Sequence, residues 1–152
     1  MKKKILTILL CGIIILGITS CGKNENEFDV GGKSDIKVSQ NDVTLSIKNG
    51  TLTKTSATLI LKNDSDMDIQ YGNPYEIEIK QNNEWHKINV TLNFTLPAYG
   101  LKPKESVELE LNWKNGYGEL AQGEYRIIKG IDIEKEDGIF ESFKVAAEFT
   151  IK

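Results

Sequence analysis

The chain has 152 residues, 39% of them hydrophobic and 27% charged, with three prolines and thirteen glycines. It is therefore long enough for one globular domain, and its composition excludes a disordered or fibrous protein. The formal net charge of −3 at pH 7 argues against a nucleic-acid partner and against a protein that lies flat on anionic lipid.

The first twenty residues have the layout of a secretory signal. Lys2, Lys3 and Lys4 form a basic start, and the apolar run from Ile5 to Leu16 is too short to span a bilayer as a helix. The following sequence Ile-Thr-Ser-Cys-Gly, residues 18–22, resembles the bacterial lipobox, in which the cysteine is diacylated and the chain is cut just before it. The resemblance predicts a lipoprotein signal peptide over residues 1–20 and lipidation of Cys21. An ordinary cleaved signal is the alternative.

Lipidation would decide both the location and the cysteine chemistry of the mature chain. Cys11 would be removed with the signal and Cys21 would be acylated, so no disulfide is predicted. Loss of three of the nineteen Lys and Arg residues leaves sixteen against twenty-two Asp and Glu, a formal charge of −6. We expect a protein held by its lipid on the outer face of the bacterial cytoplasmic membrane, with the membrane as one partner.

Residues 21–35 are polar, contain glycine and show no period, which predicts a flexible tether followed by one domain over residues 36–152. Within that domain apolar and polar residues alternate, as in half-buried strands, and no helix of useful length is predicted. Acidic residues such as Glu76 and Glu78 are expected to face solvent. The inward positions are Val43, Leu45 and Ile47; Ala57, Leu59 and Leu61; Tyr75, Ile77 and Ile79; Val107, Leu109, Leu111 and Trp113; Tyr125, Ile127, Ile131 and Ile133; and Phe143, Val145, Ala147, Phe149 and Ile151.

Three carboxylates, Asp64, Asp66 and Asp68, alternate in the turn that follows the second of these runs. The spacing is that of the start of a calcium loop, but no glycine follows the third acid and Tyr75 occupies the twelfth position, so an EF-hand loop is excluded. A solvated turn in which Asp and Asn bond the local backbone is favoured, and a weak metal site is the alternative.

His86 is the only histidine and lies beside Trp85 on the second arm of a predicted hairpin. No second histidine, cysteine or nucleophile accompanies it in the sequence, so a surface or strand-edge role is favoured. The acids do not form a recognisable catalytic pattern either. We therefore predict no enzymatic activity and no cofactor.

The stretch from Leu92 to Pro103 is irregular, and the strand after it ends in Trp113. Leu120, Gly123 and Tyr125 then have the spacing of a tyrosine corner, in which a Tyr hydroxyl bonds the backbone a few residues upstream. An ordinary inward-facing aromatic is the alternative for Tyr125. Gly130 interrupts the next strand in a way that predicts a β-bulge.

About seven strands, regular turn signals and the tyrosine corner predict an all-β, immunoglobulin-like, two-sheet Greek-key sandwich without a disulfide. A closed barrel is the alternative. The chain from about Asp42 to Ile151 also resembles a family of bacterial immunoglobulin-like domains of Gram-positive surface proteins and lipoproteins, some attached to membrane-embedded sensor-type peptidases. The resemblance is carried by residues 59–63, Tyr71-Gly72 with Tyr75, the Trp85 arm, Asn112-Trp113, residues 117–120 and 123–129, and Glu148-Phe149.

The resemblance implies a fold but no settled ligand, because sandwiches of this class serve unrelated tasks. The first hypothesis is a membrane-anchored, non-enzymatic binding or interaction module with a protein or cell-wall partner. Its candidate contact residues are Tyr71, Tyr99, Tyr117 and His86, each with a structural role as the alternative. The second hypothesis is a proteinase inhibitor that presents the irregular loop from Leu92 to Pro103.

Overall fold

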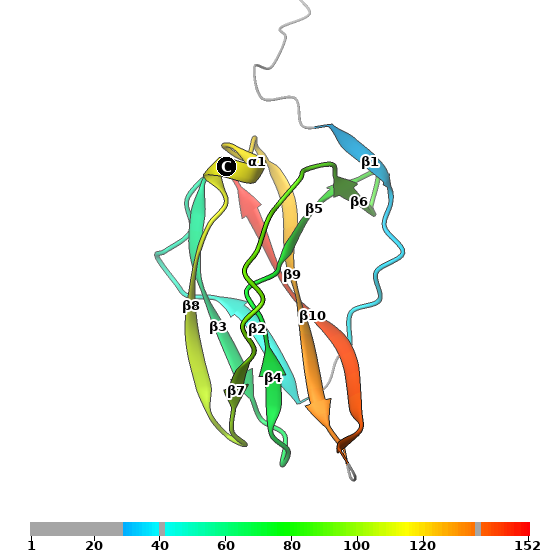
Figure 1. The fold of residues 1–152 in the computed structure, drawn as a ribbon. Coiled ribbons are helices and arrows are strands. Elements are labelled where there is room, and N and C mark those ends of the chain that lie inside the picture. The colour runs from blue at the N-terminus through cyan, green and yellow to red at the C-terminus, as the bar shows by residue number, and fades with distance from the viewer. Residues whose placement is uncertain (1–28, 40–41, 136–137) are drawn as a thin grey trace, which may run out of the picture.

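The computed structural model describes residues 29–39, 42–135 and 138–152. Its elements are β1 (Val30–Lys33), β2 (Val43–Ile47), β3 (Ser56–Asn63), β4 (Ile69–Tyr71), β5 (Glu76–Gln81), β6 (Glu84–Ile88), β7 (Tyr99–Leu101), β8 (Ser106–Asn112), α1 (Lys114–Tyr117), β9 (Gly123–Glu134) and β10 (Phe140–Ile151). Two antiparallel sheets face each other (Figure 1), so the predicted two-sheet sandwich is confirmed and the barrel alternative is wrong. The described residues form ten strands in place of the predicted seven or so, because β1, β4 and β7 are too short to show an alternation.

The larger sheet is built around β9, which is twelve residues long. Strand β10 pairs with β9 along one edge, while β5 and β4 follow one another along the other edge. Strands β6 and β1 extend the sheet beyond β5, and β7 extends it beyond β4. The smaller sheet has the order β2, β3, β8. The β9–β10 register runs without a shift through the pair Gly130 and Lys144, so the predicted bulge at Gly130 is wrong.

Part of the predicted tether belongs to the sheet. Strand β1 pairs with β6, and Ser34 N donates to Trp85 O at 2.7 Å. The chain then crosses the outer face of the larger sheet, where Lys87 pairs with Asp35 at 3.1 Å and Ser39 N donates to Lys144 O at 2.8 Å. The prediction of a flexible tether is therefore wrong for residues 30–35. These residues are polar and contain glycine, so their sequence does not show the alternation of a strand. The strand forms because it pairs with β6, which lies far along the chain.

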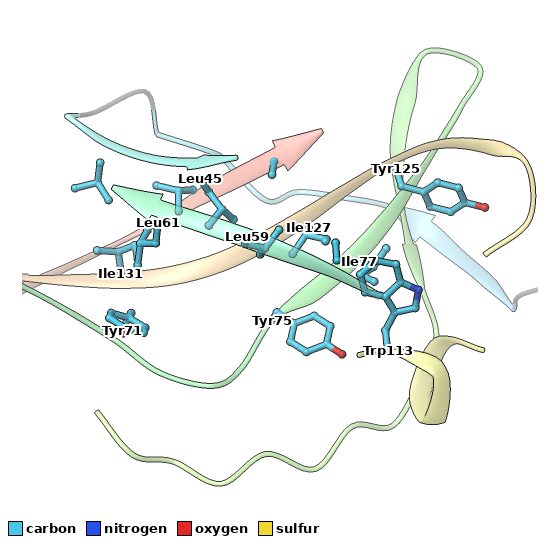
Figure 2. Packing of buried hydrophobic residues seen from close by; sticks show 14 of the residues in the cluster. Leu45, Leu59, Leu61, Tyr71, Tyr75, Ile77, Trp113, Tyr125, Ile127 and Ile131 are labelled. Atoms are coloured by element: carbon cyan, nitrogen blue, oxygen red, sulfur yellow. The ribbon is translucent and has the colours of Figure 1, made fainter. Parts of the chain in front are cut away.

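The core lies between the two sheets and contains the predicted inward side chains of both (Figure 2). Leu59 and Leu61 of β3 face Ile77, Ile127 and Ile131 of the larger sheet, and all are buried. The fully buried Trp113 closes one end of the core, and its indole Nε1 donates to Lys54 O at 2.9 Å. Because both the ring and its polar atom are satisfied, Trp113 is a structural residue.

The tyrosine corner is present. Tyr125 is fully buried, and its hydroxyl donates to Ala121 O, four residues upstream, at 2.9 Å. Its ring stacks on Phe149 with 5.6 Å between the ring centroids, and Phe149 in turn lies beside Trp113. The corner thus ties the start of β9 to the segment that crosses from α1, and the alternative of a plain inward aromatic is wrong.

The corner hydrogen bond allows a direct test. We expect Tyr125→Phe to lower the free energy of unfolding by about 1 kcal/mol, the usual net contribution of one such bond. Urea unfolding measures it. Tyr99→Phe is the matched control, because the Tyr99 side chain is exposed and its hydroxyl has no partner within the described residues. Equal stabilities of Tyr125→Phe and the wild type would contradict a role for this bond.

Candidate functional site

The predicted lipidation site and the other predicted site residues differ in whether the structure describes them. Cys21, the predicted lipidation site, lies outside the described residues, so its lipidation stays a prediction. Within the described ranges no helix has the length and apolar character needed to cross a membrane. The remaining candidates all lie in described segments.

The three candidate tyrosines do not form one surface. Tyr117 is 5% exposed, and its hydroxyl oxygen accepts a hydrogen bond from Ile77 N at 2.9 Å. Burial raises the pKa of Tyr117 to about 12. Tyr71 is 9% exposed and lies against Tyr99, with 5.4 Å between the ring centroids. Only Tyr99, on the edge strand β7 and 43% exposed, has substantial surface for a partner, so we assign Tyr71 and Tyr117 to the core.

His86 lies on β6, half-buried between β5 and β1. Its Nδ1 is 3.3 Å from Gly31 O. No group of three or more His, Cys, Asp or Glu side chains gathers around it or anywhere else in the described ranges. His86 therefore lies on an interior strand of the larger sheet, paired with Lys33 and Ile79, and the prediction of a strand edge is wrong.

The acidic turn is organised by Asn63 and by lysines. Asn63 is fully buried, its Nδ2 donates to Met67 O and Leu101 O, and its Oδ1 accepts from Ser65. Local bonding of the turn by an Asn side chain is thus confirmed. Each carboxylate pairs with a different lysine: Asp64 with Lys62, Asp66 with Lys104, and Asp68 with Lys102. The three carboxylates therefore point to three separate lysine side chains and do not converge on one point.

The irregular stretch from Leu92 to Pro103 is not a loop that projects as a unit. Leu92 and Phe94 are half-buried against the core, Phe94 lies 5.2 Å from Tyr75 in an edge-on arrangement, and residues 99–101 form β7. Leu96, in contrast, is 84% exposed. Leu96 is thus the most exposed large apolar side chain of a segment whose ends pack against the core and pair within the sheet.

Leu96 borders a pocket on the outer face of the larger sheet, which we call the Gly130 pocket. Its volume is about 430 Å³, within the range of small-ligand sites. Its lining residues are Gln70, Tyr71, Gly72, Pro74, Leu96, Pro97, Ala98, Gly130, Ile131, Asp132, Ser142, Phe143 and Lys144. No heavy atom would lie within 4 Å of a Cβ at Gly130, so the missing side chain leaves the middle of this face open.

The walls of the Gly130 pocket differ in character. Gln70, Asp132 and Ser142 lie opposite one another on β4, β9 and β10, and Ser142 Oγ donates to Asp132 Oδ1. Lys144, the partner of Gly130 on β10, pairs with Glu76 at 2.6 Å. Pro74, Leu96 and Pro97 form the apolar side. Such a pocket can hold an apolar group and hydrogen-bond its polar edge.

A buried lysine holds one wall of this pocket from the core side. Strand period places Lys129 inward, between Ile127 and Ile131, and the side chain is only 2% exposed. Its Nζ donates to Gly72 O at 2.7 Å and to Pro74 O at 3.2 Å, at the break between β4 and β5. Burial lowers the pKa of Lys129 to about 8. The sequence signal that could have identified this lysine was an ionisable residue at an inward-facing strand position.

A second group missed from sequence is the buried pair of Glu78 and Arg126. Glu78, expected in solvent, is 1% exposed, and Arg126 Nη2 lies 2.6 Å from Glu78 Oε2. Trp85 lies over the guanidinium, 4.7 Å from its carbon to the ring centroid. The expectation of a solvated acid was wrong here because the neighbouring strand and Trp85 cover the outer face. Glu78 is the only buried carboxylate in the described part of the chain, and a cation neutralises it.

Comparison with known families supports the architecture. Residues 39–150 match the family described as bacterial Ig-like domain. The chain belongs to this family. No curated protein matches the chain, and no solved structure matches it either. The match spans β2 to the last residue but one of β10, while β1, at the outer edge of the larger sheet, lies outside it.

Proposed function

We propose that the protein is a lipid-anchored, non-enzymatic binding module on the outer face of the bacterial cytoplasmic membrane. The lipobox at Cys21 supports the anchor. The bacterial Ig-like domain supports a binding or interaction role, since loops and sheet surfaces of sandwiches commonly carry recognition. The observation that carries the binding role is the Gly130 pocket, which is preformed, has both polar and apolar walls, and borders the exposed Leu96. Its occupant is a group of a protein or cell-wall partner.

The anchor can be tested by labelling. We expect Cys21→Ala to abolish incorporation of palmitate and to release the protein from the membrane fraction, because the anchored atom is the Cys21 thiol. Cys11→Ala is the matched control, since Cys11 lies within the predicted signal peptide, and it should leave labelling unchanged. Labelling that survives in Cys21→Ala would contradict the anchor.

The pocket can be tested by filling it. Gly130→Val adds a β-branched residue in open space within a strand, so the fold should be kept. A photo-crosslinking amino acid at Ser142, on living cells, should capture the partner, and Gly130→Val should reduce the yield about tenfold, which corresponds to about 1.4 kcal/mol of binding. The control position is Thr44, which is exposed on the smaller sheet.

The outcomes of the crosslinking experiment are distinct. Capture from Ser142 that Gly130→Val does not reduce, or equal capture from Thr44, would contradict a site in the pocket. A protease captured from this position and inhibited by the protein would favour the alternative function, an inhibitor that presents Leu96. The 84% exposure of Leu96 is the observation that favours this second function.

A further inference from the structure

We infer that the end of the sandwich that carries α1 faces the membrane, and that Lys54, Lys114 and Lys152 contact anionic lipid headgroups there. This inference rests on the proposed anchor at Cys21. It assigns an interaction surface with a defined chemistry, in addition to the Gly130 pocket on the outer face of the larger sheet.

The position of β1 determines which end is near the bilayer. Only eight residue steps separate Cys21 from Asp29, where the described chain begins, and a chain of that length spans at most about 28 Å in any conformation. Strand β9, with twelve residues, is about 40 Å long. Strand β1 lies at the α1 end of the sandwich (Figure 1). The segment that joins Cys21 to the domain is therefore shorter than the domain, and it is attached at the α1 end.

The three lysines gather at the same end. Lys54 O accepts hydrogen bonds from Trp113 Nε1, just before α1, and from Leu120 N, just after it, so Lys54 lies at the α1 end. Lys114 is the first residue of α1. Lys152 follows Ile151, which pairs with Gly123 at the start of β9. All three are exposed, and none forms an ion pair within residues 29–39, 42–135 and 138–152.

The charges of the domain are separated along its length. At the α1 end Glu84 and Glu124 pair with Lys33 and Lys80, which leaves Asp29 beside β1, Glu119 after α1 and Glu148 near the end of β10 as exposed carboxylates without an ion pair among the described residues. At the opposite end the exposed carboxylates Asp42, Glu105 and Glu134 form no ion pair with described residues. The unpaired lysines and carboxylates thus offset each other at the α1 end, whereas the opposite end keeps unpaired negative charge.

This separation favours an upright domain. Lysines close to an anionic bilayer are attracted by its negative surface potential, and the attraction fades within a Debye length. The acidic remainder of the domain is repelled by the same surface. An upright orientation brings the lysines to the headgroups and keeps the acidic end and the Gly130 pocket available to partners.

The test uses the full-length lipidated protein in phosphatidylcholine vesicles with and without phosphatidylglycerol. A fluorophore is attached to a single cysteine at Asn115→Cys in α1 or at Ile139→Cys at the opposite end, and a quencher is attached to the headgroups. We expect quenching at position 115 and little at position 139. Phosphatidylglycerol should increase quenching at 115, and Lys54→Glu with Lys114→Glu should remove that increase. Lys37→Glu with Lys104→Glu is the charge-matched control.

Each outcome bears on a separate claim. Protein that does not float with the vesicles overturns the proposed anchor. Floating protein with equal or greater quenching at position 139 overturns the orientation. Quenching at position 115 that phosphatidylglycerol does not increase, or that both double variants reduce equally, overturns the lysine contact with anionic lipid.

Discussion

Raising the pH from about 8 to about 10 is expected to stabilise the folded domain by about 2 kcal/mol through Lys129. The pKa of this ammonium group falls from 10.5 in the unfolded chain to about 8 in the fold because burial disfavours its charge. Between these values the unfolded state binds more protons, so stability rises with pH. Below about pH 8 the Lys129 ammonium is charged in both the folded and the unfolded state, so the folded state bears the full cost of burying that charge.

The rise should end near pH 10, where a second set of groups acts in the opposite direction. Burial raises the pKa of Tyr75, Tyr117 and Tyr125 above their usual 10.0. Above this pH the unfolded tyrosines lose protons that the folded ones keep, so stability falls. Urea unfolding at a series of pH values would show a maximum near pH 10.

The assignment of the rise to Lys129 requires a variant without the titrating group. In Lys129→Met the increase between about pH 8 and 10 should disappear, whatever the variant's stability at pH 7. Lys54→Met, which removes an exposed lysine, should keep the increase. Parallel pH profiles for the wild type and Lys129→Met would show that the Lys129 ammonium is not titrating in this window.

Arg126→Met is expected to destabilise the domain by about 3 to 5 kcal/mol, because it leaves the Glu78 carboxylate buried without a cation. Both contacts from Arg126 go to Glu78 Oε2, while Oε1 has no hydrogen-bond partner among the described atoms. The loss of the guanidinium would therefore leave both oxygens unsatisfied. A decrease of the melting temperature by about 10 °C or more would accompany this loss.

Removal of both charges separates the pair from the packing around it. Arg126→Met combined with Glu78→Leu should recover most of the lost stability, because hydrophobic replacement of a buried pair is often neutral. Lys48→Met is the surface control: Lys48 pairs with Glu108 in an exposed position, and its loss should cost less than about 1 kcal/mol. A double variant as unstable as Arg126→Met would contradict this account.

Much of the fold could be predicted because strand alternation is a local property. The inward positions of β2 and β3 follow directly from residues 43–47 and 56–62, and the spacing of Gly123 and Tyr125 indicated the corner. Three-residue strands such as β4 and β7 were missed, since they are too short for a period. Strand β1 was missed because its polar, glycine-rich sequence depends on β6 for pairing.

The candidate site was predicted less well, because exposure is a property of the packed molecule. Tyr71 and Tyr99 pair directly across β4 and β7, yet the inner strand buries one and the sheet edge exposes the other. Glu76 and Glu78 have the same local pattern, but only Glu78 meets Arg126 and is covered by its surroundings. Neither difference is encoded in neighbouring residues.

The sequence by itself determined the all-β class, the family and the tyrosine corner, because these depend on residue spacing along one segment. It also carries the predicted anchor at Cys21. Only the tertiary structure decided the Gly130 pocket, the support of its wall by Lys129, and the gathering of lysines at the α1 end. The walls of the pocket come from four segments between Gln70 and Lys144. Their meeting depends on strand pairing between residues far apart in the chain.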